Sequence, residues 1–165
     1  MSIRRVVNHE EIDRNPAAPV GEIDDFCREL AKDLLDTMYA SPGCVGLAAP
    51  QIGVSQRAFA VNVTGHKKTK ICHGEMVLFD PVIIEKSDPE LAREGCMSVP
   101  ELTGDVSRFT RITIVAKTLE AAEVVIESDA FEARALQHEI DHLDGLLFLD
   151  RLASPGALHI RKVYK

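Results

Sequence analysis

A histidine pair on an expected helix constrains this chain more than any other feature. Residues 138–142 read HEIDH, an HExxH run inside a segment rich in helix-forming residues. Histidines four residues apart lie on one face of a helix, so His138 and His142 can reach a single metal ion. Glu139 lies about 100 degrees further round the helix, where its carboxylate can act on water without ligating the ion. The run therefore predicts a helix that carries a hydrolytic metal site.

The residues around this run are apolar, which predicts that the helix is buried. Leu136, Ile140 and Leu143 lie within it, and Leu146 and Leu147 follow. The alternative is a surface helix that places two histidines and two acids together by chance. Charged residues rarely stay unpaired in a core helix, so a cation shared by the two histidines explains the pattern more simply.

Chain order limits the choice of a third ligand. Phe148 stands six residues after His142, where the metzincin proteases have another histidine, and no glutamate follows Glu139. We therefore expect an upstream ligand, and Cys96, in the turn 94–98, is the preferred one. Asp150 stays open as a ligand, and a buried structural thiol stays open for Cys96. A Cys/His/His set leaves a fourth position for water, as catalytic sites require.

Composition predicts one domain without a nucleic-acid or membrane partner. The 165 residues are 45% hydrophobic and 27% charged, which is typical of a globular protein. The net charge of −7 disfavours a polyanionic partner. No stretch approaches the roughly 20 apolar residues that span a bilayer, and the N-terminus lacks an apolar signal core. The expected compartment is the cytoplasm, where four irregularly spaced cysteines stay reduced.

The periodicity predicts helices near both ends and short strands between them. Apolar residues from Ile23 to Met38 recur at helical steps, and Pro42 and Gly43 end that amphipathic helix. Asp129 and Glu132 have the spacing of a capping box for the HExxH helix. Strands are expected at 58–63, 76–80, 82–85, 111–117 and 123–126, loops at 87–110, and a closing helix at 156–164.

These elements combine into one α+β domain over residues 1–165. We expect short antiparallel or mixed β-sheets packed around a central HExxH helix, with the amphipathic helix N-terminal to them.

Three segments in a fixed order resemble a known family. They are GCVGLAAPQIG at 43–53, EGCMSVP at 94–100 and QHEIDHLDG at 137–145. Together they resemble the signature motifs of peptide deformylases, and the likeness extends over nearly the whole chain. Two departures stand out: Cys44 replaces the usual first glycine of the first motif, and Met97 replaces the usual leucine of the second.

The resemblance implies a role for each matching residue. It makes Cys96, His138 and His142 the metal ligands and Glu139 the catalytic acid and base. The side-chain amide of Gln51 and the backbone N–H of Met97 would donate to the oxyanion. Without the motif, Gln51 would read as a turn-capping amide and the groove residues as core packing. The implied methionine pocket and peptide groove comprise Cys44, Val45, Gly46, Glu94, Gly95, Phe131 and Ala135.

The implied reaction removes the formyl group from N-formylmethionine at the start of new polypeptides and releases formate. The resemblance implies one divalent ion per chain, with Fe²⁺ preferred and Zn²⁺, Ni²⁺ or Co²⁺ as substitutes. It also implies N-formylmethionyl peptides or nascent chains at the ribosome as partners, and a monomer or weak homodimer.

Two alternatives remain at this point. One is a deformylase-like paralogue with altered substrate choice, suggested by Cys44. The other is a silent metal-binding module, against which Glu139 argues, because a structural site needs no base.

Overall fold

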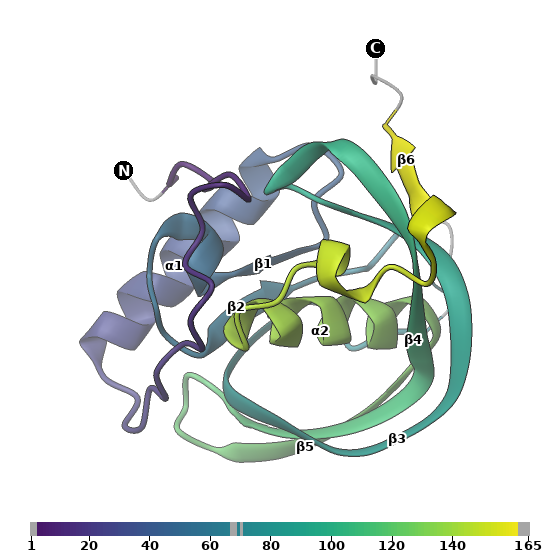
Figure 1. The fold of residues 1–165 in the computed structure, drawn as a ribbon. Coiled ribbons are helices and arrows are strands. Elements are labelled where there is room, and N and C mark those ends of the chain that lie inside the picture. The colour runs from purple at the N-terminus through teal and green to yellow at the C-terminus, as the bar shows by residue number, and fades with distance from the viewer. Residues whose placement is uncertain (1–2, 67–68, 70, 162–165) are drawn as a thin grey trace.

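A curved sheet wraps around one central helix in this protein (Figure 1). The computed structural model describes residues 3–66, 69 and 71–161. Helix α2 (Ala130–Leu143) lies at the centre, and helix α1 (Asp25–Ala40) lies beyond strands β1 and β2. None of the helices in these residues is long and apolar enough to cross a membrane.

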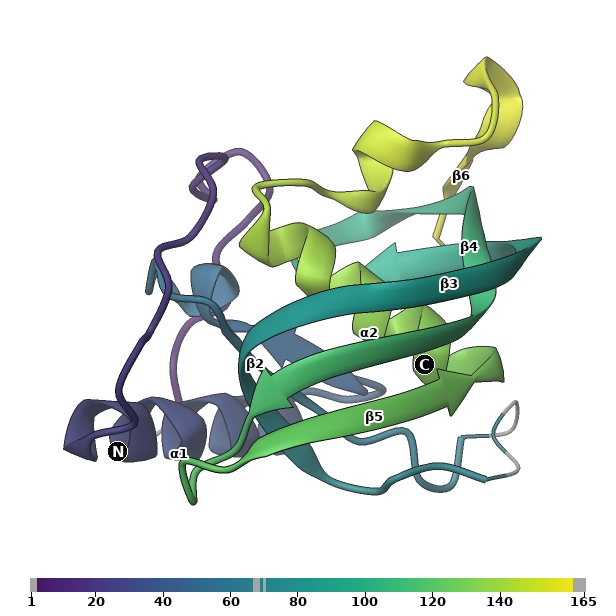
Figure 2. The ribbon, with the colours of Figure 1, turned by 90° about the horizontal axis from the view of Figure 1, so that it is seen from below.

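One six-stranded sheet contains every strand of the described residues, and all of its strand pairs are antiparallel. The order is β1-β2-β3-β4-β5, and β6 pairs with β4. Figure 2 shows β3, β4 and β5 crossing α2. The bounds are β1 Gly46–Ala48, β2 Ala58–Val61, β3 Met76–Cys96, β4 Val99–Lys117, β5 Glu123–Asp129 and β6 Leu158–Ile160. Three short 3-10 helices complete the fold: η1 Ala49–Ile52, η2 Phe148–Arg151 and η3 Pro155–Ala157.

The long β3–β4 hairpin corrects the expectation of loops at 87–110. Its strands pair from Phe79 opposite Lys117 to Cys96 opposite Val99, around a turn at Met97 and Ser98. Residues 84–91 are all exposed, so no apolar alternation marks this part as strand. Backbone pairing along the hairpin forms the strands here, and it places the turn directly after Cys96, the expected metal ligand.

The expected closing helix at 156–164 is also wrong. Ser154 and Pro155 do begin a helix, but η3 ends at Ala157 and the chain continues as β6. Leu158 pairs with Gly104 and Ile160 with Leu102, so backbone pairing overrides local helix signals. Residues 162–164 of the expected helix lie outside the described residues.

The two faces of β2 are both buried, and each packs against a different helix. Successive side chains of a strand point to opposite faces, so Ala58 and Ala60 pack in the cluster of α1, with Leu34. Phe59 and Val61 pack in the other cluster, with Leu136 and Ile140 of α2. Every residue of α2 from Glu132 to Leu143 is buried. The helix with the histidine pair is therefore the core element of the fold.

Candidate active site

Cys96, His138 and His142 converge at the end of β3. Their ligand atoms all lie within 4.8 Å of one another, and all three residues are buried. Nε2 of His142 lies 3.4 Å from Sγ of Cys96 and 3.2 Å from Nε2 of His138. Helical spacing brings the histidines together, and the β3–β4 hairpin brings the cysteine to them. Asp150, the alternative ligand, instead receives hydrogen bonds from Arg14 and from the Leu147 backbone.

The two short distances at Nε2 of His142 fit a bound divalent ion. Metal–nitrogen bonds of about 2.0–2.1 Å and metal–sulfur bonds of about 2.3 Å in tetrahedral geometry separate ligand atoms by about 3.3–3.6 Å. Thiolate and imidazole are the donors that Fe²⁺, Zn²⁺, Ni²⁺ and Co²⁺ accept. The residues therefore fit one divalent ion, with a fourth position open to water or substrate.

A buried carboxylate orients His138. Glu94 Oε1 lies 2.8 Å from Nδ1 of His138, which leaves Nε2 for a metal ion. Arg108 donates to both oxygens of Glu94, at 2.8 and 2.9 Å, and Arg134 Nη1 donates to Oε2 at 2.7 Å. Burial opposes ionisation, but the hydrogen bonds from Arg108 and His138 outweigh it and hold the pKa of Glu94 well below its usual range. Glu94 thus positions His138, and its carboxylate is already occupied by three partners.

A second buried acid, Asp141, pairs with arginine side chains next to the site. Asp141, inside the HExxH run, accepts a hydrogen bond from Arg108 Nη1. Arg151 also donates to Asp141, from Nε at 2.5 Å and from Nη2 at 3.0 Å. Arg108 is therefore paired with two acids in a water-poor interior, where an unpaired charge would be strongly destabilising.

Glu139 lies beside the ligands with a free carboxylate oxygen. Its Oε1 is buried without a hydrogen-bond partner, and Oε2 approaches Gly46 so closely that a Cβ there would lie 2.6 Å away. Glycine at position 46 therefore makes room for the carboxylate. Burial raises the pKa of the Glu139 carboxyl to about 7. A group with such a pKa can both accept and return a proton near neutral pH.

Gln51 is fixed by contacts at both ends of its amide. Its Oε1 accepts a hydrogen bond from the Ala48 N–H at 3.0 Å. Its Nε2 lies 3.4 Å from Cys96 Sγ and donates to Ser98 Oγ at 3.1 Å. The amide nitrogen thus points to the Cys96 sulfur, and Met97 directly follows Cys96 in the hairpin turn.

The N-terminal segment ties the two loops of the site together. The Val7 N–H donates to the Gln51 carbonyl at 2.6 Å, and the His9 N–H donates to the Ser98 carbonyl at 2.7 Å. Most side chains of this segment are at least partly exposed, so few of them pack in the core. Backbone hydrogen bonds therefore contribute much of what holds the segment in place.

Cys44 lies near the site as a neutral thiol. Its Sγ donates to the Gly46 carbonyl at 3.1 Å. Burial, followed by the negative charge of Glu139, raises the pKa of Cys44 to about 12. The thiol is therefore held against the loop backbone and adds no charge near Glu139.

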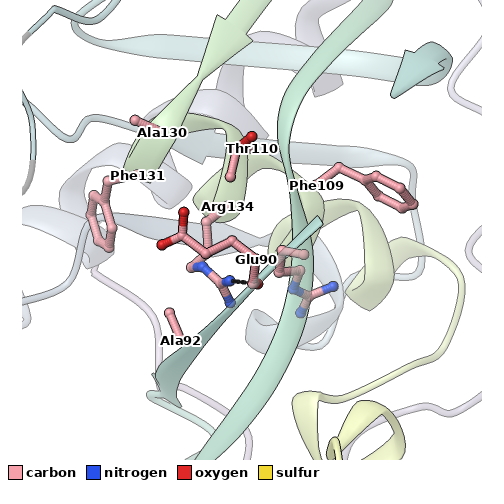
Figure 3. A pocket seen from close by; sticks show the side chains of 8 residues that line it. Glu90, Ala92, Phe109, Thr110, Ala130, Phe131 and Arg134 are labelled. Carbon is pink, nitrogen blue, oxygen red and sulfur yellow. Dashed lines mark hydrogen bonds between the residues drawn. The ribbon is translucent and has the colours of Figure 1, made fainter. Parts of the chain in front are cut away.

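A pocket of about 290 Å³ opens between β3, β4 and the start of α2 (Figure 3). Phe131 lines it and stacks on His66 with ring centroids 3.9 Å apart. Arg134 crosses its wall and donates to the Glu90 carbonyl at 2.7 Å, the dashed line in Figure 3. Val45 and Ala135 pack in the neighbouring apolar cluster. The pocket is lined by Glu90, Ala92, Arg108, Phe109, Thr110, Ala130, Phe131 and Arg134.

Several residues of the site had no sequence signal. Arg108 and Arg134 both contact predicted site residues, but each stands in a strand or helix without a motif of its own. Ser98 lies inside the segment EGCMSVP, but no role was expected for it. Asp141 lay inside the HExxH run and had no expected partner. Arginine and aspartate are usually exposed, so nothing in their local sequence predicts burial.

The sequence is similar to proteins of one family. A family model described as polypeptide deformylase matches residues 3–157. The peptide deformylase of Natranaerobius thermophilus is 41% identical over 153 residues, which cover 92% of this chain and 93% of that protein. Peptide deformylase 1 of Bacillus subtilis is 38% identical, over 93% of this chain and 92% of its own length.

Solved structures agree with the fold described above. The peptide deformylase of Thermotoga maritima superimposes with a TM-score of 0.83 at 34% identity, covering 92% of this chain and 99% of that one. The peptide deformylase of Ehrlichia chaffeensis in complex with actinonin gives a TM-score of 0.85 at 33% identity, covering 93% and 91%.

Proposed function

The chain belongs to the polypeptide deformylase family and is a hydrolase that removes the formyl group from nascent polypeptides, and we propose how its own residues do so. The observation that carries the proposal is the buried Cys96, His138 and His142 group with the unpartnered carboxylate oxygen of Glu139 beside it. The group can hold one metal ion, in keeping with the metal use of the family.

In this proposal Cys96, His138 and His142 bind one divalent ion, with Fe²⁺ preferred and Zn²⁺, Ni²⁺ or Co²⁺ able to replace it. The bound ion would act as a Lewis acid toward the formyl oxygen and acidify a water molecule. Glu94 orients His138 by accepting a hydrogen bond from its Nδ1–H group, which leaves Nε2 free to bind the ion.

Glu139 is the proposed acid and base. Its carboxylate takes a proton from the attacking water and returns it to the leaving α-amine as formate is released. A pKa of about 7 in the metal-free protein supports both roles. The close approach of Gly46 holds the carboxylate in one place.

Gln51 and the Met97 N–H are the proposed donors to the oxygen that gains negative charge. Nε2 of Gln51 carries two hydrogens, which are directed to Cys96 Sγ and Ser98 Oγ without substrate. To donate to the substrate oxygen, the amide exchanges one of these contacts for it. Removing one donor from an oxyanion hole typically costs about 10²–10³ in rate.

We propose that the peptide binds as an extended strand between two glycines. Gly46 lies in edge strand β1, beside Glu139, and Gly95 directly precedes Cys96. In the described residues, β3 between residues 84 and 96 pairs only with β4, so its other edge is free for backbone hydrogen bonds. The methionine side chain would enter the pocket beside Phe131. Cys44, Val45, Glu94 and Ala135 would shape the surroundings.

The nature of the substrate indicates the compartment in which the enzyme works. A protein that acts on nascent formylated chains works where they are made, so we propose a cytoplasmic enzyme that meets them at or near the ribosome. It would act as a monomer or a weak homodimer, because the ligand set and Glu139 all come from one chain.

The test is formate release from formyl-Met-Ala-Ser after loading with Fe²⁺ or Ni²⁺. Glu139→Gln should lower kcat at least 10²-fold, whereas Glu127→Gln, at an exposed position on β5, should leave it unchanged. Cys96→Ser should lose metal, and Cys72→Ser should retain it. Absence of formate release by the loaded wild type, with cleavage of other acylated amines, would support a paralogue of altered substrate choice.

A further inference from the structure

The last described residue of the chain reaches back to the site. Strand β6 pairs with Leu102–Gly104 of β4, and the next residue, Arg161, donates its backbone N–H to the Glu101 carbonyl at 2.8 Å. A Cβ built on Gly95 would lie 1.8 Å from Nη2 of Arg161 and 3.0 Å from its Cζ. The guanidinium therefore lies directly on the backbone of Gly95, one residue from the metal ligand Cys96.

This guanidinium has no acid to neutralise it in the described part of the chain. Its Nε is buried without a hydrogen-bond partner, and it forms no ion pair there. The neighbouring Arg93 differs, because its Nε lies 3.6 Å from Asp105. Asp105 is also engaged by Nε2 of His159 at 2.9 Å. Among the described residues, no acid thus compensates the positive charge over Gly95.

Strand alternation defines which face of β3 carries this charge. Glu94 and Cys96 are buried on the inner face, with the pocket and the ligands, whereas Arg93 and Gly95 are exposed on the outer face. The Arg161 guanidinium occupies the space of a Gly95 side chain, so it lies on the outer face. A peptide that pairs with the free edge of β3 alternates in the same way. If its first side chain enters the inner pocket, its second projects outward toward Arg161.

We propose that Arg161 is a specificity-determining residue that favours an acidic side chain directly after the formylmethionine. This inference rests on the proposed function, because it needs the formyl group at the metal ligands and the peptide along β3. A carboxylate at the second position accepts hydrogen bonds from a guanidinium that has no competing acid in the part of the chain that the structure describes. A lysine at that position is repelled. Because the site is partly open to solvent, the effect is moderate and weakens with salt.

The experiment compares three C-terminally amidated peptides with Glu, Gln or Lys at the second position, formyl-Met-X-Ala-Ser-NH₂. Amidation removes the terminal carboxylate, which could also contact Arg161. We expect the metal-loaded wild type to prefer Glu over Lys by roughly fivefold or more in kcat/KM, mostly through KM. The preference should shrink as the salt concentration rises.

Variants separate Arg161 from the general charge of the protein. Arg161→Met should abolish the preference and Arg161→Glu should reverse it, with metal content and kcat for the Gln peptide unchanged. Arg93→Met, a matched change on the same face, should preserve it. Equal use of the three peptides by the wild type, or an unchanged preference in Arg161→Met, would overturn the inference. Absence of formate release from every peptide would instead count against the proposed function.

Discussion

Glu94 Oε1 lies 2.8 Å from Nδ1 of His138, so a carboxylate held by two arginines also orients the imidazole whose Nε2 faces His142. Glu94 stands two residues before Cys96 on the same face of β3. One short strand segment therefore supplies a proposed metal ligand and the group that orients a second proposed ligand. This arrangement links metal affinity to buried charges that do not touch the metal.

Replacing that carboxylate should weaken metal binding. Glu94→Gln removes the charge that orients His138 and leaves Arg108 and Arg134 with less compensation. We expect metal affinity to fall about 10- to 100-fold, as measured by competition with a chelator. Glu85→Gln, at an exposed position of β3, is the control and should bind metal as the wild type does. Equal affinities for the two variants would contradict the orienting role of Glu94.

The metal-free protein should lose stability as Glu139 ionises. Burial raises the pKa of Glu139 from 4.5 to about 7, so the folded state favours its protonated form. This contribution is fully present below pH 4.5 and is lost as the pH rises through about 7. The loss amounts to about 3 kcal/mol of unfolding free energy at most.

Urea unfolding of the chelator-treated protein between pH 4.5 and 8 measures this loss. The difference between wild type and Glu139→Gln should grow with pH in favour of the variant. A difference that stays constant over this range would show that Glu139 ionises as it does in the unfolded chain.

A methyl group at position 46 should displace the carboxylate of Glu139, the proposed acid and base. In Gly46→Ala the new Cβ would lie 2.6 Å from Oε2 and 3.0 Å from Cδ of Glu139, so the end of that side chain must move. A shift of about 1 Å can cost about 10²-fold in rate, and we expect kcat to fall by that order while the protein stays folded. Gly156→Ala is the control, because nothing lies within 4 Å of its Cβ. A kcat within twofold of the wild type would refute the close fit.

Oxygen should inactivate the iron-loaded enzyme. A thiolate ligand beside Fe²⁺ is open to oxidation, and the Cys96 sulfur is the ligand at risk. We expect the half-life of formyl-peptide cleavage in air to be shorter for the iron form than for the nickel form, and the two to converge under argon. Mass spectrometry should then find added oxygen on the peptide with Cys96. Equal half-lives in air would contradict this chemistry.

Local sequence patterns indicated Cys96, His138 and His142, which the structure brings together, but not the charged residues that position them. The spacing of His138 and His142 is a property of one helix, so it could be read without the fold. Arg108 and Arg134 reach Glu94 from β4 and α2, and only long-range pairing brings these elements together. The same limit applies to residues 87–110, whose pairing as strands depends on the partner strand and on no apolar alternation of their own.

The C-terminal part shows how a clear local signal can mislead. Ser154 and Pro155 are good helix-starting residues, and a helix does begin there, but it ends at Ala157. Pairing of Leu158 and Ile160 with β4 then determines the path of the chain and places Arg161 over Gly95. No helix prediction could have indicated that contact.

The N-terminal segment has a consequence for how the enzyme matures. His9 bonds to Ser98, 89 residues later, and Arg14 donates to Gly145, 131 residues later. Because synthesis starts at the N-terminus, this segment can form these contacts only after Ser98 and Gly145 have been made, near the end of synthesis. Contacts of such long sequence separation form late in folding. We therefore expect Cys96, His138 and His142 to take up metal only after nearly the whole polypeptide is made, because a chain that stops before His142 lacks one member of this group.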